Sequence, residues 1–270
     1  MTPREPLHEM RPTTRFSDRA GDYAKYRPTY PADAIDAILG GLPPAERGGV
    51  LQAPIVAADV GAGTGISARL LAERGVRVIA IEPNDAMRAA AEPHALIEWR
   101  AGTAEATGLD DASVDLVLCA QSYHWFEPAA ACREFARILR PGGRLALVWN
   151  DGDETDHVAR GYYDLVREAS DGAGPTSHQS AARDPTFAPP VDPARVRRLR
   201  FRNEQRLDEA SLIGRAMSAS YVPKTGPRTD RLIEGLRALH ARHAGADGRV
   251  ALVYEVLMYL FTRDNEPRPL

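Results

Sequence analysis

Short apolar runs alternate with amphipathic segments through the middle of this chain. Continuous apolar runs predict buried strands, and apolar stripes at helical spacing predict the helices that cover them. Five strands are predicted here, at residues 54–61, 76–83, 97–102, 114–121 and 144–150. Helices are predicted between them, at residues 65–74, 84–92 and 127–139. Strands that alternate with helices are typical of a parallel sheet covered on both faces.

The regular alternation of apolar runs and amphipathic segments stops on either side of residues 54–150. A stripe of apolar residues predicts a helix over 32–42. Beyond residue 150, helices are predicted at 157–169, 208–219 and 228–243, and a strand at 198–207. Residues 249–263 are predicted to form a long final strand, with a helix as the open alternative. The whole pattern predicts an α/β, Rossmann-like fold with a seven-stranded, mostly parallel sheet whose last strand is antiparallel.

Composition narrows the class of protein. The 270 residues, 44% hydrophobic and 26% charged, suit one substantial globular core. A net charge of -3 argues against a nucleic-acid partner. No apolar run approaches the roughly 20 residues that span a bilayer, and the N-terminus lacks an apolar segment, so we expect no membrane partner and a cytoplasmic location. Cys119 and Cys132 stand outside any cysteine or histidine cluster, so no metal site is expected.

The strongest chemical signal is a glycine-rich turn where the first predicted strand meets a helix. Residues 59–65 read Asp-Val-Gly-Ala-Gly-Thr-Gly, and Glu82 ends the next strand 23 residues after Asp59. Gly61, Gly63 and Gly65 allow a tight turn and the close approach of a ligand to the backbone. An acid at the second strand tip can accept hydrogen bonds from both ribose hydroxyls. We therefore expect a nucleoside-type ligand here.

The spacing of the glycines bears on which ligand binds. A dinucleotide fingerprint would place a third glycine at residue 66, which is Ile66. No Gly-Lys-Ser/Thr follows the turn, which excludes a P-loop. An adenosine that carries an amine and a carboxylate suits the turn, with Asp59 as the acceptor for the amine.

The turn and three further segments resemble the class I S-adenosylmethionine-dependent methyltransferases. The further segments are Ala-Ile-Glu-Pro around Glu82, residues 101–115, and the Arg-x-Leu-Arg-Pro-Gly-Gly-Arg run at 137–144. The resemblance implies S-adenosyl-L-methionine as cofactor, with Gln121 beside its methionine end. It also implies that the turn after the third strand lies near the adenine, through Gly102, Thr103, Ala104 and Glu105.

Residues 16–31 resemble the N-terminal segment of the ubiquinone-biosynthesis and trans-aconitate methyltransferase subgroup. That resemblance implies a cap over the cofactor, with Tyr23, Tyr26 and Arg27 near its carboxylate; the alternative is that the tyrosines pin a helix to the core. We accordingly expect a flexible tail at 1–15, a cap at 16–45, a cofactor-binding core at 54–150 and a substrate-pocket region at 151–270. Within that last region, insertions are expected at 151–195 and 208–245.

The candidate catalytic residues follow the fourth predicted strand. His124 is the candidate base because its ordinary pKa lies near neutrality, and Tyr123 is its candidate catalytic neighbour. Trp125, and Tyr221 farther along the chain, are candidate substrate contacts; a packing role for residues 124–126 is the alternative. A magnesium site is disfavoured because Ala120 and Gln121 stand where metal-dependent relatives carry a carboxylate. The Pro-Pro motif of nucleobase amino-methyltransferases is absent.

The sequence thus predicts methyl transfer to an O, N, C or S atom of a small-molecule metabolite, in a role such as biosynthetic tailoring. Two alternatives stay open: a protein that keeps the cofactor pocket but promotes cyclisation, and a nicotinamide-dependent oxidoreductase. The oligomeric state and the acceptor are not predicted.

Overall fold

The computed structural model describes residues 20–42, 45–47, 50–170 and 196–263, and it confirms the predicted sheet. Seven strands lie in the order β5-β4-β3-β6-β7-β9-β8. β9 is antiparallel to both of its neighbours, and the pairs from β5 to β7 are parallel. The strands are β3 (Val56–Val60), β4 (Arg77–Ile81), β5 (Ile97–Arg100), β6 (Val114–Ala120), β7 (Leu139–Gly152), β8 (Arg197–Leu207) and β9 (Val250–Thr262).

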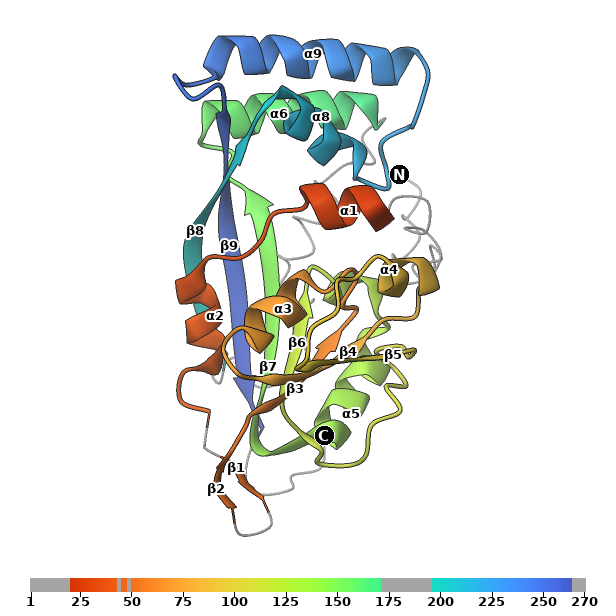
Figure 1. The fold of residues 1–270 in the computed structure, drawn as a ribbon, viewed down its shortest axis with the longest axis vertical. Coiled ribbons are helices and arrows are strands. Elements are labelled where there is room, and N and C mark those ends of the chain that lie inside the picture. The colour runs from red at the N-terminus through yellow and green to blue at the C-terminus, as the bar shows by residue number, and fades with distance from the viewer. Residues whose placement is uncertain (1–19, 43–44, 48–49, 171–195, 264–270) are drawn as a thin grey trace.

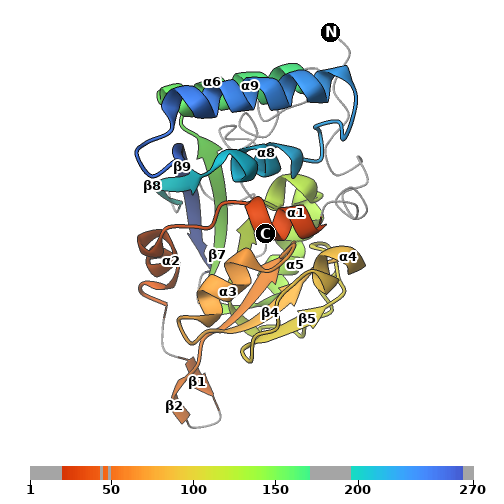
Figure 2. The same cartoon turned by 45° about the horizontal axis from the view of Figure 1, so that its top comes forward.

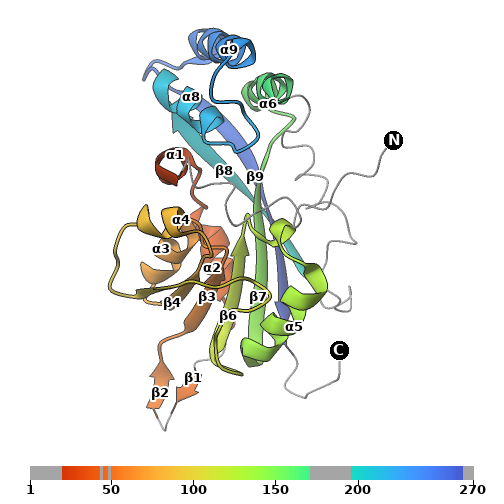
Figure 3. The ribbon, with the colours of Figure 1, turned by 90° about the vertical axis from the view of Figure 1, so that its right-hand side faces the viewer.

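Helices cover the two faces of the sheet (Figures 1 and 3). One face carries α2 (Ala32–Leu39) and α3 (Ile66–Ala72), and the other carries α5 (Pro128–Ile138). Alternate residues of β4 enter the two cores: Val78 packs with α2 and α3, whereas Ile79 packs with α5. This two-sided burial explains why the strands read as continuous apolar runs.

A separate helical layer lies beyond the carboxyl end of β7. It consists of α6 (His157–Ala169), α8 (Glu209–Met217) and α9 (Pro227–His243), which share their own apolar core with the start of β9. α1 (Ala20–Tyr26) lies between this layer and the pair of α3 and α4 (Asp85–Ala89), as Figures 1 and 2 show. No helix in the described ranges combines the length and apolar character needed to cross a membrane.

The structure corrects several predicted boundaries. β7 begins at Leu139, five residues before the predicted start, and its register against β6 shifts between Val114 and Leu116. Residues 141–143 therefore form a bend inside a strand, with Gly142 at a φ of 74°. β9 is a strand throughout, because it pairs along its length with β7 and β8.

Two short strands had no counterpart in the sequence analysis. β1 (Ala45–Arg47) and β2 (Val50–Ala53) form an antiparallel pair before β3. The expected tail at 1–15, the cap residues 16–19, and residues 171–195 of the insertion expected at 151–195 lie outside the described residues.

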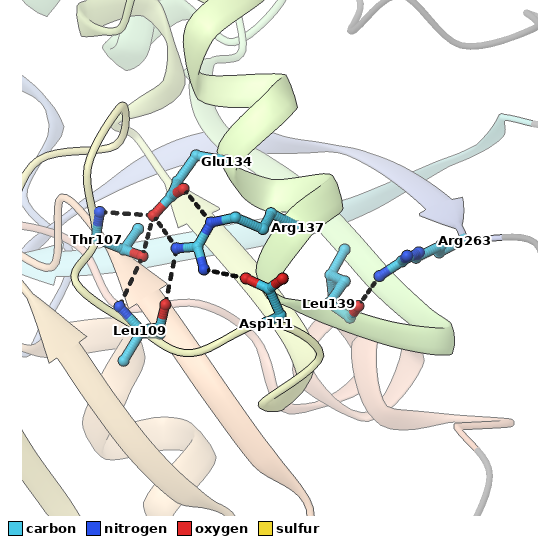
Figure 4. A network of polar contacts seen from close by, with 7 residues as sticks. All are labelled: Thr107, Leu109, Asp111, Glu134, Arg137, Leu139 and Arg263. Atoms are coloured by element: carbon cyan, nitrogen blue, oxygen red, sulfur yellow. Dashed lines mark hydrogen bonds and ion pairs between the residues drawn. The ribbon is translucent and has the colours of Figure 1, made fainter. Parts of the chain in front are cut away.

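A polar network fixes the loop between β5 and β6 against α5 (Figure 4). Glu134 accepts hydrogen bonds from the backbone nitrogen and hydroxyl of Thr107, and Arg137 contacts Asp111 and the carbonyl of Leu109. The Arg137 guanidinium lowers the pKa of Glu134 to about 2. This network holds the loop that follows the predicted adenine turn.

Candidate functional site

The glycine turn connects β3 to α3 at the carboxyl edge of the sheet. Gly61, Gly63 and Gly65 all have positive φ angles, of 68°, 60° and 85°. A Cβ atom on Gly61 would lie 2.6 Å from Cβ of Ser122, and one on Gly65 would lie 2.9 Å from the Trp99 ring. Conformation and close packing together therefore require glycine at these two positions.

Glu82 lies directly beside this turn. Its Oε2 accepts a hydrogen bond from the backbone nitrogen of Gly63 at 2.9 Å, and its Oε1 accepts one from that of Asn84 at 2.9 Å. Burial raises the pKa of Glu82, whose exposed fraction is 8%. Each carboxylate oxygen has two acceptor positions, so the carboxylate keeps capacity for the hydroxyls of a ligand.

Asp59 is fully buried under the turn. Its Oδ2 accepts a hydrogen bond from Oγ of Ser67 at 2.7 Å, whereas Oδ1 has no hydrogen-bond partner. Burial raises its pKa to about 7, and the charge of nearby Glu82 adds to the increase. A buried acceptor without a donor is costly, and it suits a ligand that brings a donor such as an amine.

The α1 segment lies over the turn. A Cβ atom on Gly63 would lie 3.8 Å from the Tyr23 ring, and the guanidinium of Arg27 lies 4.7 Å from the centroid of that ring. Arg27 also donates a hydrogen bond to the carbonyl of Ser218, while its Nε has no partner. A cation thus lies near the glycine turn.

Polar contacts hold the end of this segment on the sheet. Asn150 and Asn203 both donate to the carbonyl of Thr29, and Gln205 donates to that of Tyr26. The side-chain oxygen of Asn150 in turn accepts a hydrogen bond from Asn203 at 2.9 Å. The cap therefore depends on β7 and β8 as well as on α8.

These elements enclose a cleft of about 460 Å³, open solvent at its mouth included. Its residues come from the cap segment, the glycine turn, the tips of β6 and β7, and α8. They are Tyr23, Arg27, Pro28, Tyr30, Gly61, Ala62, Ile66, Ser67, Ala120, Gln121, Asn150 and Arg215. The structure thus brings together four residues that the sequence analysis predicted, namely Tyr23, Arg27, Gly61 and Gln121.

Gln121 has an unusual backbone conformation for its residue type. Its φ is 57°, and its side-chain nitrogen donates to the carbonyl of Asn150 at 3.0 Å. Non-glycine residues in this region are uncommon and gather at functional sites.

The turn after β5 lies beside the tip of β4. A Cβ atom on Gly102 would lie 3.0 Å from Cγ2 of Ile81, the residue before Glu82. Thr103 and Ala106 exchange backbone hydrogen bonds, which closes the turn, and Ala104 is buried. Glu105 accepts a hydrogen bond from the backbone nitrogen of Glu127. This turn is therefore close to the Glu82 carboxylate.

Comparison with known proteins shows similarity to methyltransferases. A family model described as a methyltransferase domain matches residues 58–147. An uncharacterised methyltransferase of Mycobacterium tuberculosis is 48% identical over 144 residues, which are 52% of this chain and 53% of that protein. Residues 58–147 of this chain therefore match a methyltransferase domain, and its similar proteins are methyltransferases.

Two further relatives agree with this methyltransferase domain. The ubiquinone/menaquinone biosynthesis C-methyltransferase of Rubrivivax gelatinosus is 39% identical over 90 residues, or 32% of this chain and 36% of that one. The solved structure of a protein assigned as a type II methyltransferase from Anaeromyxobacter dehalogenans is similar with a TM-score of 0.63 and 26% identity, covering 90% of this chain and 100% of that one. The chain spans about half the length of the first curated relatives it matches.

The predicted catalytic pair is absent from the residues that line the cleft. Tyr123 has no exposed surface, lies in the core beneath α5, and places its hydroxyl 3.4 Å from Sγ of Cys132. Burial raises the pKa of Tyr123. His124 is 5% exposed, and its Nδ1 accepts a hydrogen bond from Nε1 of Trp149 at 3.1 Å. Both side chains are buried, and a catalytic role for them stays a prediction.

Three other residues predicted as ligand contacts, Tyr26, Trp125 and Tyr221, each lie in a different environment. Tyr26 packs against α8, where a Cβ atom on Gly214 would lie 2.5 Å from its ring, so it holds the cap and does not line the cleft. The Trp125 ring lies 5.1 Å from that of His124, outside the residues that line the cleft. Tyr221 packs against the core of the helical layer and acts electrostatically on Arg215.

Sequence reasoning missed Arg215, which lines the cleft from α8. The available signal was its position: Leu212 and Ala216, one helical turn apart, are buried, and Arg215 lies on the same face. An arginine within the apolar stripe of a helix indicates either a buried ion pair or a ligand contact.

Proposed function

We propose that this chain transfers a methyl group from S-adenosylmethionine to an O, N, C or S atom of a small molecule. The observation that carries the proposal is the buried Oδ1 of Asp59, which has no donor and lies under the glycine turn beside Glu82. A ligand with an amine and a ribose supplies donors to both carboxylates. S-adenosylmethionine has both groups.

Different residues of the site would contact different parts of this cofactor. Glu82 would accept from the ribose hydroxyls, Asp59 from the amine, and Arg27 would donate to the carboxylate. Thr103, Ala104 and Glu105 would lie near the adenine, and Gln121 near the methionine end. When bound, the cofactor supplies an electrophilic methyl group on its sulfonium. The protein then contributes mainly by placing the acceptor in line at short distance.

The likeness to a ubiquinone/menaquinone biosynthesis methyltransferase supports a small-molecule acceptor and a biosynthetic role. The family model ends at residue 147, before the helical layer of α6, α8 and α9 begins. That layer, with Tyr221, would therefore select the acceptor.

The test uses S-adenosylmethionine with a deuterated methyl group, the full chain and a fractionated metabolite extract. We expect a deuterated product and an equal amount of S-adenosylhomocysteine by mass spectrometry. Conversion of a metabolite without S-adenosylhomocysteine release would point to a cyclase that keeps the cofactor pocket. Tight binding of NADH in place of S-adenosylmethionine would point to an oxidoreductase.

A further inference from the structure

Arg215 is a buried cation without a carboxylate partner in the part of the chain that the structure describes. Its exposed fraction is 6%, and within the described residues it forms no ion pair. Its Nε atom is buried and has no hydrogen-bond partner. An arginine stays protonated in proteins, so a full positive charge is buried here at a cost in stability. Such a charge is retained most readily when an anion binds to it during function.

The groups around Arg215 are neutral hydroxyl groups. Four tyrosines act on it electrostatically: Tyr162, Tyr163, Tyr221 and Tyr254. Burial raises the pKa of Tyr162 and Tyr163, which keeps their hydroxyls protonated at neutral pH. Tyr254 donates a hydrogen bond to Oε1 of Gln205 at 3.1 Å. The hydroxyls and the guanidinium provide hydrogen-bond donors, and the guanidinium also carries one net positive charge.

Arg215 and Arg27 reach the cleft from different elements of the fold. Arg27 lies over the ring of Tyr23, which lies close to the glycine turn. Arg215 belongs to α8, in the helical layer beyond the sheet (Figures 2 and 3), and its tyrosines come from α6, β9 and the segment after α8. Both line the same cleft, together with Gln121 and Asn150 at the tips of β6 and β7. The cleft therefore has one cation near the turn and a second near the helical layer.

We infer that Arg215 binds a carboxylate group of the methyl acceptor, so that the substrate class is an organic acid. This inference rests on the proposed function, because it takes the cleft as a cofactor and acceptor site. A guanidinium pairs with a carboxylate through two parallel hydrogen bonds. With Arg27 assigned to the carboxylate of the cofactor, Arg215 leaves one positive charge for the acceptor, which balances a monoanion better than a phosphate dianion.

The test measures preference for a charged ligand over its neutral isostere. The full chain, saturated with S-adenosylhomocysteine, is titrated calorimetrically with acetate, succinate and benzoate, each compared with its amide. We expect at least one acid to bind about tenfold more tightly than its amide, since hydrogen bonds between two charged groups are stronger than those to a neutral one. If every acid binds no better than its amide, or inorganic phosphate binds more tightly than all three, the inference is overturned.

Variants assign the preference to Arg215. Arg215→Met should abolish it and Arg215→Lys should retain part of it, whereas Arg200→Met should leave it unchanged because Arg200 is exposed on β8. The melting temperature of Arg215→Met without ligand should be no lower than that of the wild type. A preference that survives in Arg215→Met, or a melting temperature that falls sharply in both Arg215 variants, would show that the arginine is structural.

A second comparison separates the acceptor's carboxylate from that of the cofactor. S-adenosylhomocysteine carries the amino-acid carboxylate, and 5′-methylthioadenosine lacks it. Arg215→Met should leave the ratio of their affinities unchanged; a selective loss for S-adenosylhomocysteine would assign Arg215 to the cofactor and overturn the inference. If the wild type binds neither compound, the proposed function fails instead, and a preference for acids measured on that unloaded protein would still support the anion site.

Discussion

At the scale of single residues, the site depends on two buried carboxylates beside one glycine turn. Glu82 binds the turn through the backbone nitrogen of Gly63, and Asp59 retains one oxygen without a donor. Their positions followed from the sequence because strand tips and glycine spacing are local features. The surroundings of His124 and Tyr123 did not, because burial of a short aromatic segment depends on which distant residues pack against it.

Glu82→Ala should weaken S-adenosylhomocysteine binding by roughly 10- to 100-fold, since hydrogen bonds to a charged group contribute about 1.5–3 kcal/mol. Isothermal titration calorimetry measures this affinity. The control is Glu98→Ala, which removes an acid of β5 whose partners are Arg77 and Arg100 and should leave the affinity unchanged. Wild-type affinity in Glu82→Ala would disprove the role of this carboxylate.

Asp59→Asn should change how stability depends on pH. Burial raises the pKa of Asp59 from 3.8 to about 7, so between these values the folded protein binds more protons than the unfolded chain. The stability of the unliganded wild type therefore falls as pH rises through this interval. Across this interval, the melting temperature of Asp59→Asn should rise relative to that of the wild type as pH increases. The control Asp110→Asn, a change at an exposed position, should show no such relative rise.

The same group should affect cofactor binding in the opposite sense. Deprotonation of Asp59 creates the charge that attracts the amine of the cofactor, so wild-type affinity should rise as pH increases through about 7. A pH profile of affinity that is identical in the wild type and the Asn variant would count against this contact.

His124→Ala should reduce stability, because the buried Nε1 of Trp149 loses its acceptor. The expected cost is about 1–3 kcal/mol, measured by denaturant unfolding. A double-mutant cycle with Trp149→Phe should give a coupling free energy on the order of 1 kcal/mol. If His124→Ala instead abolishes methyl transfer and leaves stability unchanged, His124 is the base that the sequence suggested.

At the scale of elements, we expect cofactor binding to depend on the cap segment as much as on the glycine turn. α1 is held on one side by contacts with α8 and on the other by hydrogen bonds to the loop that follows it. Sequence patterns predicted the individual helices and strands well. They could not place α8 over the cleft, because this depends on pairing across more than 100 residues between the end of β7 and β9. Arg215 was missed for that reason.

Gly214→Ala should weaken cofactor binding by displacing α1. The added Cβ atom would lie 2.5 Å from the ring of Tyr26, and α1 carries Tyr23 toward the glycine turn. We expect faster hydrogen exchange in α1 and several-fold lower affinity for S-adenosylhomocysteine, with the sheet unaffected. Gly21→Ala is the matched control, because a Cβ atom there meets nothing within 4 Å. Equal exchange rates in the two variants would contradict this role of the cap.

At the scale of the whole molecule, the chain combines a sheet matched in part by a methyltransferase domain model with a helical layer that lies beyond that match. The family model covers residues 58–147, which hold Asp59, the glycine turn, Glu82 and Gln121. Arg215 and its tyrosines all lie beyond that range. Cofactor chemistry could therefore be predicted from motifs, whereas the acceptor could be addressed only once the layer had been placed against the sheet.

The most direct measurement is calorimetric titration of the ligand-stripped full chain with S-adenosylhomocysteine. The account predicts saturable binding at one site, accompanied by a rise in melting temperature, and lost or strongly weakened in Glu82→Ala. No heat and no change in melting temperature with either S-adenosylhomocysteine or S-adenosylmethionine would contradict it.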